Sequence, residues 1–370
     1  MKLCIAGKNN IAVYCLQAAL EYQEKDPSLE IVVVYNRTEC GKNTWQKSLK
    51  YYAECWNVPA VQLEDVYGEK ELVFLSLEYD RLLVPQKFAT NQLFNIHFSL
   101  LPAYKGMYTS SIPFLQGEKT VGVTLHRVDS GIDTGEIIEQ VSFDIEETDM
   151  CRSLYAKYIS YGTELVKSNL KKIIYEPEKI ESRPQTSTRS SYFSKKYIDY
   201  QNLTVELRQT AYYIVNQIRA FAFREYQLPI VQNTPIVWAK LGDERTFEKP
   251  GTILEDTEYY LKLATIDYAV YLYKDKFNEL LDACRDGKIE LVKKICYDYA
   301  YQNDQNEKGI TPLLCAVSSN QKEVACYLAE NGADISVSDY EGNTPLMYAE
   351  EVYKKSGDST LLRCFQQSRR

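Results

Sequence analysis

Over the first 145 residues, segments with the apolar pattern of strands are interspersed with segments that have the apolar pattern of helices. Continuous aliphatic or β-branched runs predict strands, because strands covered on both faces are apolar at every position. Such runs occupy residues 3–6, 31–35, 72–77, 94–97, 121–126 and 137–143. Helix-like periodicity occupies residues 11–22 and 44–55. Strands and helices in this order predict the α/β class, with a largely parallel, Rossmann-like sheet and helices on both faces.

The middle of the chain is organised differently. A long amphipathic pattern over 150–174 predicts a helix that closes a first domain, which we place at residues 1–175. Residues 176–189 are rich in Pro, Ser and Thr, a composition typical of a linker. Short strand-like runs separated by turn residues then predict a small β-rich middle domain over residues 190–275.

The last hundred residues carry an internal repeat of 33 residues. The sequence Thr-Pro-Leu at 311–313 recurs at 344–346, and alanines follow the same step at positions 283, 316 and 349. A 33-residue period with Thr-Pro-Leu opening each helix pair is typical of ankyrin repeats, whose terminal copies are atypical caps. We therefore predict about three all-α ankyrin repeats over residues 276–370.

Composition narrows the classes of function. The chain has 43 basic and 51 acidic residues, a net charge of −8, whereas nucleic-acid-binding proteins are usually basic. No window approaches the roughly 18 apolar residues of a membrane span, and the N-terminus lacks a signal-peptide pattern. We therefore expect a cytoplasmic protein that binds neither nucleic acid nor membrane. Ten cysteines without C-x-x-C spacing and only two histidines predict reduced thiols and no metal.

The two histidines are the candidates for proton transfer near neutral pH. His97 ends a predicted strand, and the period of two places Asn95 on the same face. This is the carboxyl end of the strand, where the ligands of such sheets bind. His126 ends the next strand and opens a loop with two glycines and two aspartates, residues 126–135. An Asn/His pair followed by an acidic Gly loop favours a functional site over a structural histidine.

Two motifs carry a family resemblance. N-x-H-x-S-L-L-P at 95–102, followed by H-x-V-D-x-G-x-D-x-G at 126–135, resembles the formyltetrahydrofolate-dependent formyltransferases over about residues 1 to 175. The resemblance implies a catalytic trio of Asn95, His97 and Asp133 and N10-formyltetrahydrofolate as co-substrate, without a metal. Residues 74–80 resemble the stretch by which sugar formyltransferases hold the pterin. The implied cofactor contacts are Ser76, Leu77, Glu78, Tyr79, Asp129 and Gly131. For Asp129 we favour turn formation or a pterin contact over catalysis.

The chemistry of the residues agrees with this implication. Formyl transfer to an amine passes through a tetrahedral intermediate with a developing oxyanion. An asparagine amide can donate a hydrogen bond to that oxygen, a contribution of about 3 kcal/mol by analogy with other oxyanion donors. The imidazole of His97 is a suitable general base for the attacking amine. A carboxylate such as Asp133 would orient that imidazole and stabilise its protonated form.

Three branches of the family differ in the amine that they formylate. The net charge disfavours methionyl-tRNA, and the ankyrin repeats are not typical of the glycinamide ribotide enzyme. Residues 38–46, 76–80 and 219–227 resemble the bacterial sugar branch, and the ankyrin tail resembles its subset that formylates dTDP-3-amino-3,6-dideoxyhexoses for surface polysaccharide (O-antigen). The alternatives left open are another amine, such as a 4-amino nucleotide sugar or glycinamide ribotide, and a non-catalytic, folate-binding ankyrin scaffold.

Substrate contacts are predicted from charge and position. A dTDP-amino sugar carries a pyrophosphate, which the start of the first helix can hold through backbone N–H groups. The predicted substrate-binding residues are Lys8, Asn9, Asn10, Lys105 and Arg224.

Two expectations concern assembly. The resemblance implies a homodimer, with the middle domain as its interface. The ankyrin repeats are expected to bind a further ligand or a partner. A stacking surface made by Tyr297, Tyr299 and Tyr301 is one hypothesis for them, and exposed loop residues are the simpler interpretation.

Overall fold

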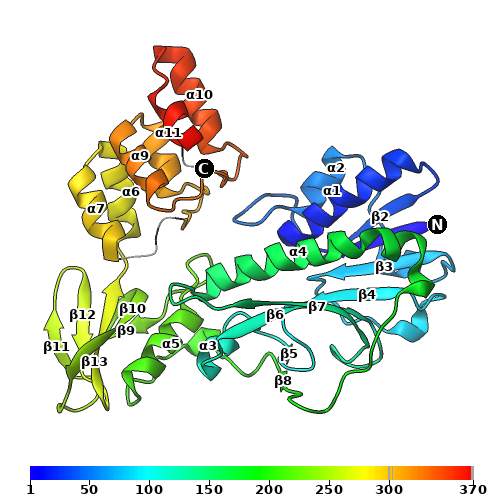
Figure 1. Ribbon diagram of the computed structural model, residues 1–370, viewed down its shortest axis with the longest axis horizontal. Helices are drawn as coiled ribbons and strands as arrows, with labels where there is room; N and C mark the ends of the chain where they lie inside the picture. Colours follow the sequence, from blue (N-terminus) through cyan, green and yellow to red (C-terminus); the bar gives the residue numbers. More distant parts are fainter. Residues whose placement is uncertain (299–300, 302, 368–370) are drawn as a thin grey trace. The chain divides into compact units, whose positions relative to one another are not determined.

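The computed structural model describes residues 1–298, 301 and 303–367. By contacts within the chain they divide into two compact units, residues 1–201 and 202–370, which are described separately below (Figure 1).

The first unit is built on a six-stranded sheet of order β2-β1-β3-β4-β6-β7. The first four strands in this order are parallel, and β6 and β7 are antiparallel to their neighbours. The predicted α/β class and the parallel core of the sheet are confirmed. The last two strands, β6 and β7, differ from the prediction because their pairings are antiparallel. The loop between β6 and β7 is too short for the crossover that parallel neighbours require. The strands are β1 (Lys2–Gly7), β2 (Glu30–Tyr35), β3 (Leu72–Leu77), β4 (Leu93–His97), β6 (Thr120–Arg127) and β7 (Ile137–Asp144).

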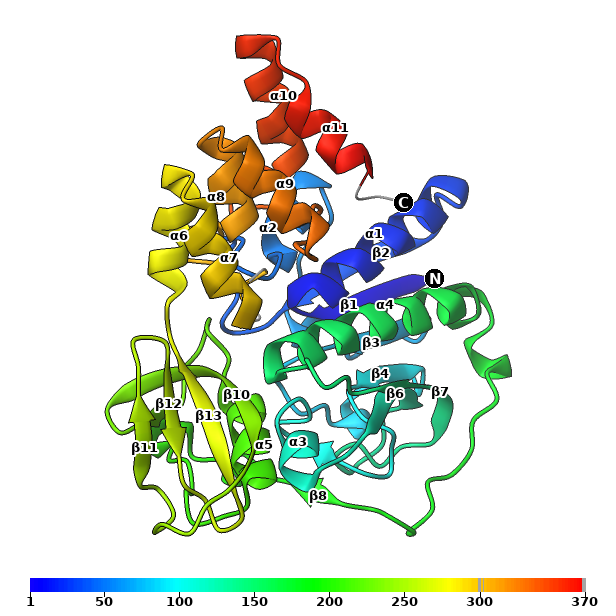
Figure 2. The same ribbon diagram turned by 60° about the vertical axis from the view of Figure 1, so that its left-hand side comes forward.

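Long helices cover one face of this sheet. The helices α1 (Asn9–Lys25) and α4 (Cys151–Tyr175) lie side by side over it (Figures 1 and 2). At Gly162 of α4, an added Cβ would lie 3.2 Å from the side chain of Ile11 and 3.3 Å from the ring of Phe98, so a larger residue would push α4 away.

The shorter elements differ from the prediction in two places. The helix predicted over 44–55 is α2 (Leu49–Cys55), which begins later because the Ser48 hydroxyl caps it by accepting from the Tyr51 N–H. The second face of the sheet is covered not by long helices but by short 3₁₀ turns and loops, with Leu63 and Phe88 in its core. The remaining elements of this unit are α3 (Ile112–Gln116), η1 (Leu63–Val66), η2 (Pro85–Lys87), η3 (Pro177–Lys179), β5 (Lys105–Gly106) and β8 (Tyr192–Phe193). The short helix η4 (Tyr200–Asn202) spans the boundary between the two units.

The second unit begins with an antiparallel sheet of order β11-β12-β13-β10-β9, with α5 (Ala211–Phe221) packed against β10. The β-rich character was predicted, but α5 and β11 were not. Every residue of β11 is exposed, so the strand leaves no apolar alternation for sequence reasoning to detect. The strands are β9 (Ile230–Val231), β10 (Thr234–Arg245), β11 (Ile253–Asp256), β12 (Tyr260–Leu263) and β13 (Tyr268–Lys274).

The rest of the second unit consists of paired helices, as the 33-residue repeat predicted. The second and third pairs each begin with the threonine of a Thr-Pro-Leu motif, because the hydroxyls of Thr311 and Thr344 accept hydrogen bonds from the N–H groups of Leu314 and Met347. The helices described are α6 (Phe277–Asp286), α7 (Ile289–Asp298), α8 (Pro312–Ser318), α9 (Lys322–Glu330), α10 (Pro345–Ser356) and α11 (Thr360–Gln367).

Neither the hypothesis of a tyrosine stacking surface nor the simpler interpretation as exposed loop residues fits this structure at Tyr301. The Tyr301 side chain is buried, and its hydroxyl accepts a hydrogen bond from the Lys276 N–H at 2.6 Å. The Tyr297 side chain and the whole of Tyr299 lie outside the described residues.

Within the described residues, no helix combines the length and the apolar character that a membrane crossing needs. The same part of the chain contains no group of three or more His, Cys, Asp or Glu side chains placed to hold a metal ion. All ten cysteines are free thiols, of which Cys40 and Cys55 are exposed and Cys326 is half-buried.

Candidate active site

The carboxyl ends of β1, β3 and β4 meet at one edge of the sheet, and the predicted catalytic residues lie there. Asn95 and His97 belong to β4, and Asn95 is paired in register with His126 of the antiparallel β6. Asp133 lies in the loop after β6. The fold therefore brings together the three residues that are 38 positions apart at most in the sequence.

His97 has a neighbour at each of its two ring nitrogens. Its Nε2 lies 2.8 Å from the carbonyl oxygen of Tyr104. A carbonyl can only accept, so Nε2 carries the hydrogen, and Nδ1 is the nitrogen that can take up a proton. Nδ1 lies 3.5 Å from Oδ2 of Asp133. The main-chain carbonyl therefore orients the ring, and the carboxylate stands where it stabilises a protonated imidazole.

His126 is a second imidazole in the same cluster. Its Nδ1 lies 2.8 Å from the Arg127 carbonyl, so Nδ1 carries the hydrogen and Nε2 accepts from the Asn95 side-chain nitrogen at 2.9 Å. Burial lowers the pKa of His126 to about 4, and the neighbouring His97 acts in the same direction. A neutral His126 thus fixes the orientation of the Asn95 amide and leaves that amide a second N–H to donate.

Asp133 is presented by a strained loop. Its φ of 53° lies in the left-handed region, and Oδ2 accepts a hydrogen bond of 2.9 Å from the Gly106 N–H. Gly135 lets the loop lie close to β6, since an added Cβ would be 1.8 Å from the Arg127 carbonyl oxygen.

Asp129 and Gly131 form a turn inside the same loop. The Asp129 carboxylate accepts from the Gly131 N–H at 3.0 Å and from the Thr134 hydroxyl at 2.6 Å. This is the turn-forming role that we favoured for Asp129. The pterin contacts predicted for these two residues remain predictions.

The residues predicted to hold the pterin lie at the end of β3. Ser76 and Leu77 are buried, and Glu78 and Tyr79 are partly exposed. Glu78 has a φ of 57°, and its carboxylate accepts hydrogen bonds from the Tyr155 hydroxyl and from the Asn9 side-chain nitrogen. Burial raises the pKa of the Glu78 carboxyl.

The start of α1 lies beside this cluster. The Lys8 N–H bonds to the Leu77 carbonyl, so the loop after β1 is joined to the end of β3. Asn9 takes part in the cluster through its side chain. Asn10 points the other way: its Oδ1 accepts from the Lys47 N–H at 2.8 Å, and its own N–H donates to Gln46. These hydrogen bonds give Asn10 a role in fixing the loop that contains Gln46 and Lys47. Its predicted contact with substrate stays a prediction.

The two remaining predicted substrate residues lie in different units. Lys105 is in β5, next to Gly106, and its ammonium donates to the Ser190 hydroxyl at 3.2 Å. Arg224 belongs to the second unit, where it binds Asp275 in bidentate fashion at 2.8 and 2.9 Å and Asp304 at 2.8 Å. These contacts give Arg224 a packing role in its own unit, and its predicted contact with substrate stays a prediction.

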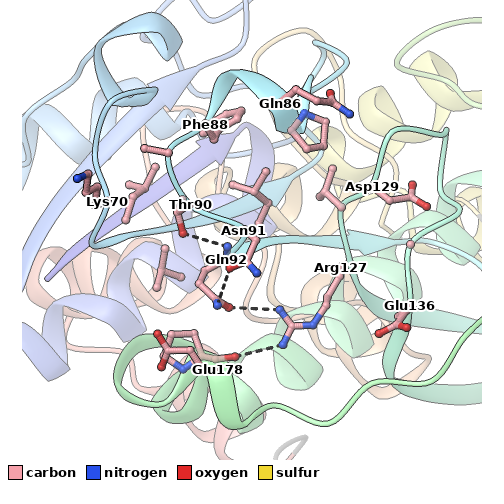
Figure 3. A pocket seen from close by; sticks show the side chains of 18 of the residues that line it. Lys70, Gln86, Phe88, Thr90, Asn91, Gln92, Arg127, Asp129, Glu136 and Glu178 are labelled. Atoms are coloured by element: carbon pink, nitrogen blue, oxygen red, sulfur yellow. Dashed lines mark hydrogen bonds between the residues drawn. The ribbon is translucent and has the colours of Figure 1, made fainter.

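A broad pocket of about 1380 Å³ opens on the same unit, at the amino ends of β3 and β4 (Figure 3). Neither Asn95 nor His97 lines it. The Arg127 guanidinium, at its wall, donates to Gln92 and to the carbonyls of Pro177 and Ile180. The pocket approaches the catalytic cluster at the Asp133 loop, through lining residues such as Asp129 and Gly135.

This chain is similar to proteins of known family and structure. Residues 70–169 match the formyl transferase family, and residues 280–356 match a family of three ankyrin repeats. An N-formyltransferase of Helicobacter canadensis, solved with folinic acid and dTDP-3-aminofucose, is 42% identical, with a TM-score of 0.68, over 74% of this chain and 100% of that one. The sugar 3N-formyl transferase WlaRD, solved in the presence of dTDP and 5-N-formyl-THF, is 41% identical, with a TM-score of 0.67, over 74% of this chain and 97% of that one. The chain belongs to the sugar N-formyltransferases.

This sugar N-formyltransferase is also similar to enzymes of another branch. A methionyl-tRNA formyltransferase of Fervidobacterium nodosum is 29% identical over 203 residues, which are 52% of this chain and 63% of that protein. The match thus spans less than two thirds of that relative.

Sequence reasoning missed three partners in the site. The Tyr104 carbonyl leaves no signal, because main-chain contacts do not depend on the identity of the side chain. Tyr155 lies on the long helix α4, and nothing in the helical periodicity marks it as a partner of Glu78. His126 was noted as the end of a strand, and the register of β4 with β6 would have placed it beside Asn95.

Proposed function

We propose that this enzyme transfers a formyl group from N10-formyltetrahydrofolate to the amine of a dTDP-linked amino-dideoxy sugar, with a dTDP-3-amino-3,6-dideoxyhexose as the preferred acceptor. The observation that carries the proposal is the cluster of Asn95, His97 and Asp133. The 42% identity to a protein solved with folinic acid and dTDP-3-aminofucose, over the whole of that protein, supports the choice of donor and acceptor.

The hydrogen bonds support the catalytic roles that we assign. His126 engages one N–H of the Asn95 amide, and we assign the second N–H to the oxyanion of the tetrahedral intermediate. The carbon of the formyl group forms its new bond to the sugar nitrogen, and its bond to N10 of the folate breaks.

The proton of the attacking amine goes to His97. Since Nε2 is bonded to the Tyr104 carbonyl, Nδ1 is the acceptor in this scheme. Asp133, 3.5 Å from Nδ1, stabilises the resulting imidazolium by its charge. The imidazolium then gives this proton to N10 of the folate, so that tetrahydrofolate leaves as a neutral amine. The orienting role first expected of Asp133 is thus divided between its carboxylate and the Tyr104 carbonyl.

The test is turnover of the purified full chain. N10-formyltetrahydrofolate is supplied with a panel of dTDP-3-amino, dTDP-4-amino and UDP-4-amino sugars, glycinamide ribotide and methionyl-tRNA, and tetrahydrofolate release is followed. We expect turnover with a dTDP-3-amino sugar, and its loss in His97→Ala and Asn95→Ala. Gln201→Glu, at an exposed position, is the control that should keep full activity.

The outcomes separate the alternatives. Turnover with only glycinamide ribotide, methionyl-tRNA or a 4-amino sugar would move the enzyme to that acceptor. Folate binding without turnover on any amine would favour the non-catalytic scaffold with ankyrin repeats.

Several wider expectations belong to the same proposal. We place catalysis in residues 1–175, a linker at 176–189, a dimer interface in the middle domain 190–275, and ankyrin repeats that bind a further ligand or partner at 276–370. A role in O-antigen synthesis and a cytoplasmic location complete it. Sedimentation of the full chain tests the homodimer directly, and a monomer at micromolar concentration would contradict it.

A further inference from the structure

The segment at residues 183–193, called the strap below, makes close contacts with the two loops that complete the catalytic cluster. After α4 the chain passes the outer strand β7 and reaches β8 (Figure 2). Arg183 pairs with Ile137 of β7 through two backbone hydrogen bonds of 2.8 Å. The composition of this stretch is typical of a linker, yet hydrogen bonds hold it at both of its ends.

One end of the strap holds the Asp133 loop through Gln185. The side-chain nitrogen of Gln185 donates to the carbonyl oxygens of Asp133, at 2.9 Å, and of Gly135, at 2.8 Å. Its Oε1 is buried and has no hydrogen-bond partner among the described residues. The amide nitrogen is therefore the part of Gln185 that binds the loop. One of its two acceptors is the carbonyl of Asp133, whose φ lies in the left-handed region.

The other end of the strap holds the Tyr104 loop through Ser191. The Ser191 hydroxyl accepts from the Tyr104 N–H at 2.8 Å, and the Ser191 carbonyl accepts from the Lys105 N–H at 3.0 Å. The rings of Tyr104 and Phe193 are stacked, with their centroids 5.6 Å apart. At Gly106 an added Cβ would be 2.3 Å from the Phe193 carbonyl oxygen, so the two backbones are in close contact.

These two loops supply the partners of the catalytic pair. The Tyr104 carbonyl orients His97, and the Gly106 N–H binds the Asp133 carboxylate. Displacement of either loop changes the relation between Nδ1 of His97 and Oδ2 of Asp133. We propose that Gln185 and Ser191 are positioning residues for formyl transfer, acting through Asp133 and through Tyr104. This inference rests on the proposed function, because the two residues matter through the catalytic pair.

The expected effect is on turnover rather than on substrate binding. Misplacement of a catalytic group by about 1 Å costs up to about 100-fold in rate. We expect Gln185→Glu, which keeps the shape but removes both donated hydrogen bonds, to lower kcat by roughly 10-fold to 100-fold with little change in KM. Ser191→Ala should act in the same direction, and Ser191→Thr, which keeps a hydroxyl, should restore activity.

Matched controls separate position from general loss of structure. Ser182→Ala removes one hydrogen bond just before the strap, to the side chain of Glu136, and should leave kcat unchanged. Gln201→Glu repeats the Gln-to-Glu exchange at an exposed site. Thermal unfolding of each variant checks that the chain is folded. If Gln185→Glu does not fold, Ser191→Ala and its threonine rescue carry the test.

A double-mutant cycle shows whether Gln185 acts through Asp133. In an Asp133→Asn background we expect Gln185→Glu to cost less than threefold, because the group that Gln185 positions is already impaired. An undiminished loss in that background would overturn the proposal. Unchanged kcat in both Gln185→Glu and Ser191→Ala would overturn it as well, as would an effect confined to KM.

A second readout does not require turnover. The chain has only two histidines, so isotope-labelled protein gives two sets of imidazole signals in NMR spectra. Gln185→Glu and Ser191→Ala should move the His97 ring signals, and Ser182→Ala should not. Signals that stay in place contradict the positioning role even if the enzyme's acceptor proves to be a different amine. Moved signals without turnover on any amine would uphold the positioning and reject only the proposed function.

Discussion

The buried His126 makes a prediction about acid sensitivity that can be worked out quantitatively. Burial lowers the pKa of His126 in the folded chain to about 4, against an ordinary value of 6.5. The unfolded chain therefore binds a proton at this ring over a range of pH in which the folded chain does not. Acid favours the unfolded state in that range, so the stability contributed by the neutral ring is lost as the pH falls from 6.5 toward 4.

The size of the effect follows from the two pKa values. Between pH 7.5 and pH 5, linkage at one such group lowers the free energy of unfolding by about 2 kcal/mol. His126→Gln removes the titrating ring but keeps an acceptor near the position of Nε2, within reach of the Asn95 amide. The variant should therefore lose about 2 kcal/mol less than the wild type over this pH interval.

Urea unfolding measured at both pH values checks this prediction. Trp45 and Trp56 lie in the first unit and Trp238 in the second, so tryptophan fluorescence in a Trp238→Phe background follows the first unit. Other titrating groups are common to both proteins, and their effects cancel when the pH-induced changes are compared. Circular dichroism at pH 7.5 serves as the control for a native fold. An equal loss of stability in both proteins would refute the claim that His126 is neutral and buried in the folded chain.

Three further substitutions test other parts of the structure. Asn95→Ala should lower kcat by about 100-fold to 1000-fold, because it removes the predicted oxyanion donor; steady-state kinetics with unchanged circular dichroism measures this, and a loss under tenfold would contradict the role. Arg224→Ala should destabilise the second unit by about 3 kcal/mol by leaving Asp275 half-buried without its ion-pair partner, as measured by Trp238 fluorescence in a background in which Trp45 and Trp56 are replaced by Phe; a raised KM with no loss of stability would instead favour the predicted contact with substrate. Gly135→Ala should abolish turnover while the chain remains folded, since its Cβ would displace the Asp133 loop from Arg127; normal kcat would contradict the close approach.

Much of the site was predictable because its residues lie at strand ends. The period of two in β4 placed Asn95 and His97 on one face, and the rule that ligands bind at carboxyl ends placed both at the functional edge. The 33-residue repeat likewise predicted the ankyrin helices, because the threonine of each Thr-Pro-Leu motif is the residue that caps the helix. Periodic burial of apolar residues and helix capping both produce recognisable sequence patterns, so these features can be predicted from the sequence alone.

The parts that were not predicted depend on contacts between main-chain groups or between distant loops. The strap was classed as a linker because Pro, Ser and Thr dominate it, yet the same small polar residues allow Ser191 to reach the Tyr104 N–H. The antiparallel direction of β6 and β7 depends on the length of the connecting loop rather than on the apolar pattern of either strand. Composition indicates only the local structural preference of a segment. These features depend instead on the tertiary contacts that each segment makes in the folded chain.

The two histidines show how one residue type serves two purposes at a single site. Each ring donates from one nitrogen to a main-chain carbonyl: His97 from Nε2 to Tyr104, and His126 from Nδ1 to Arg127. The rings are therefore held as opposite tautomers, and each keeps one acceptor nitrogen directed into the cluster. The acceptor of His97 faces the Asp133 carboxylate, whereas that of His126 is taken by the Asn95 amide. The proposed base, His97, thus differs from the positioning group, His126, in the side chain that its acceptor nitrogen faces.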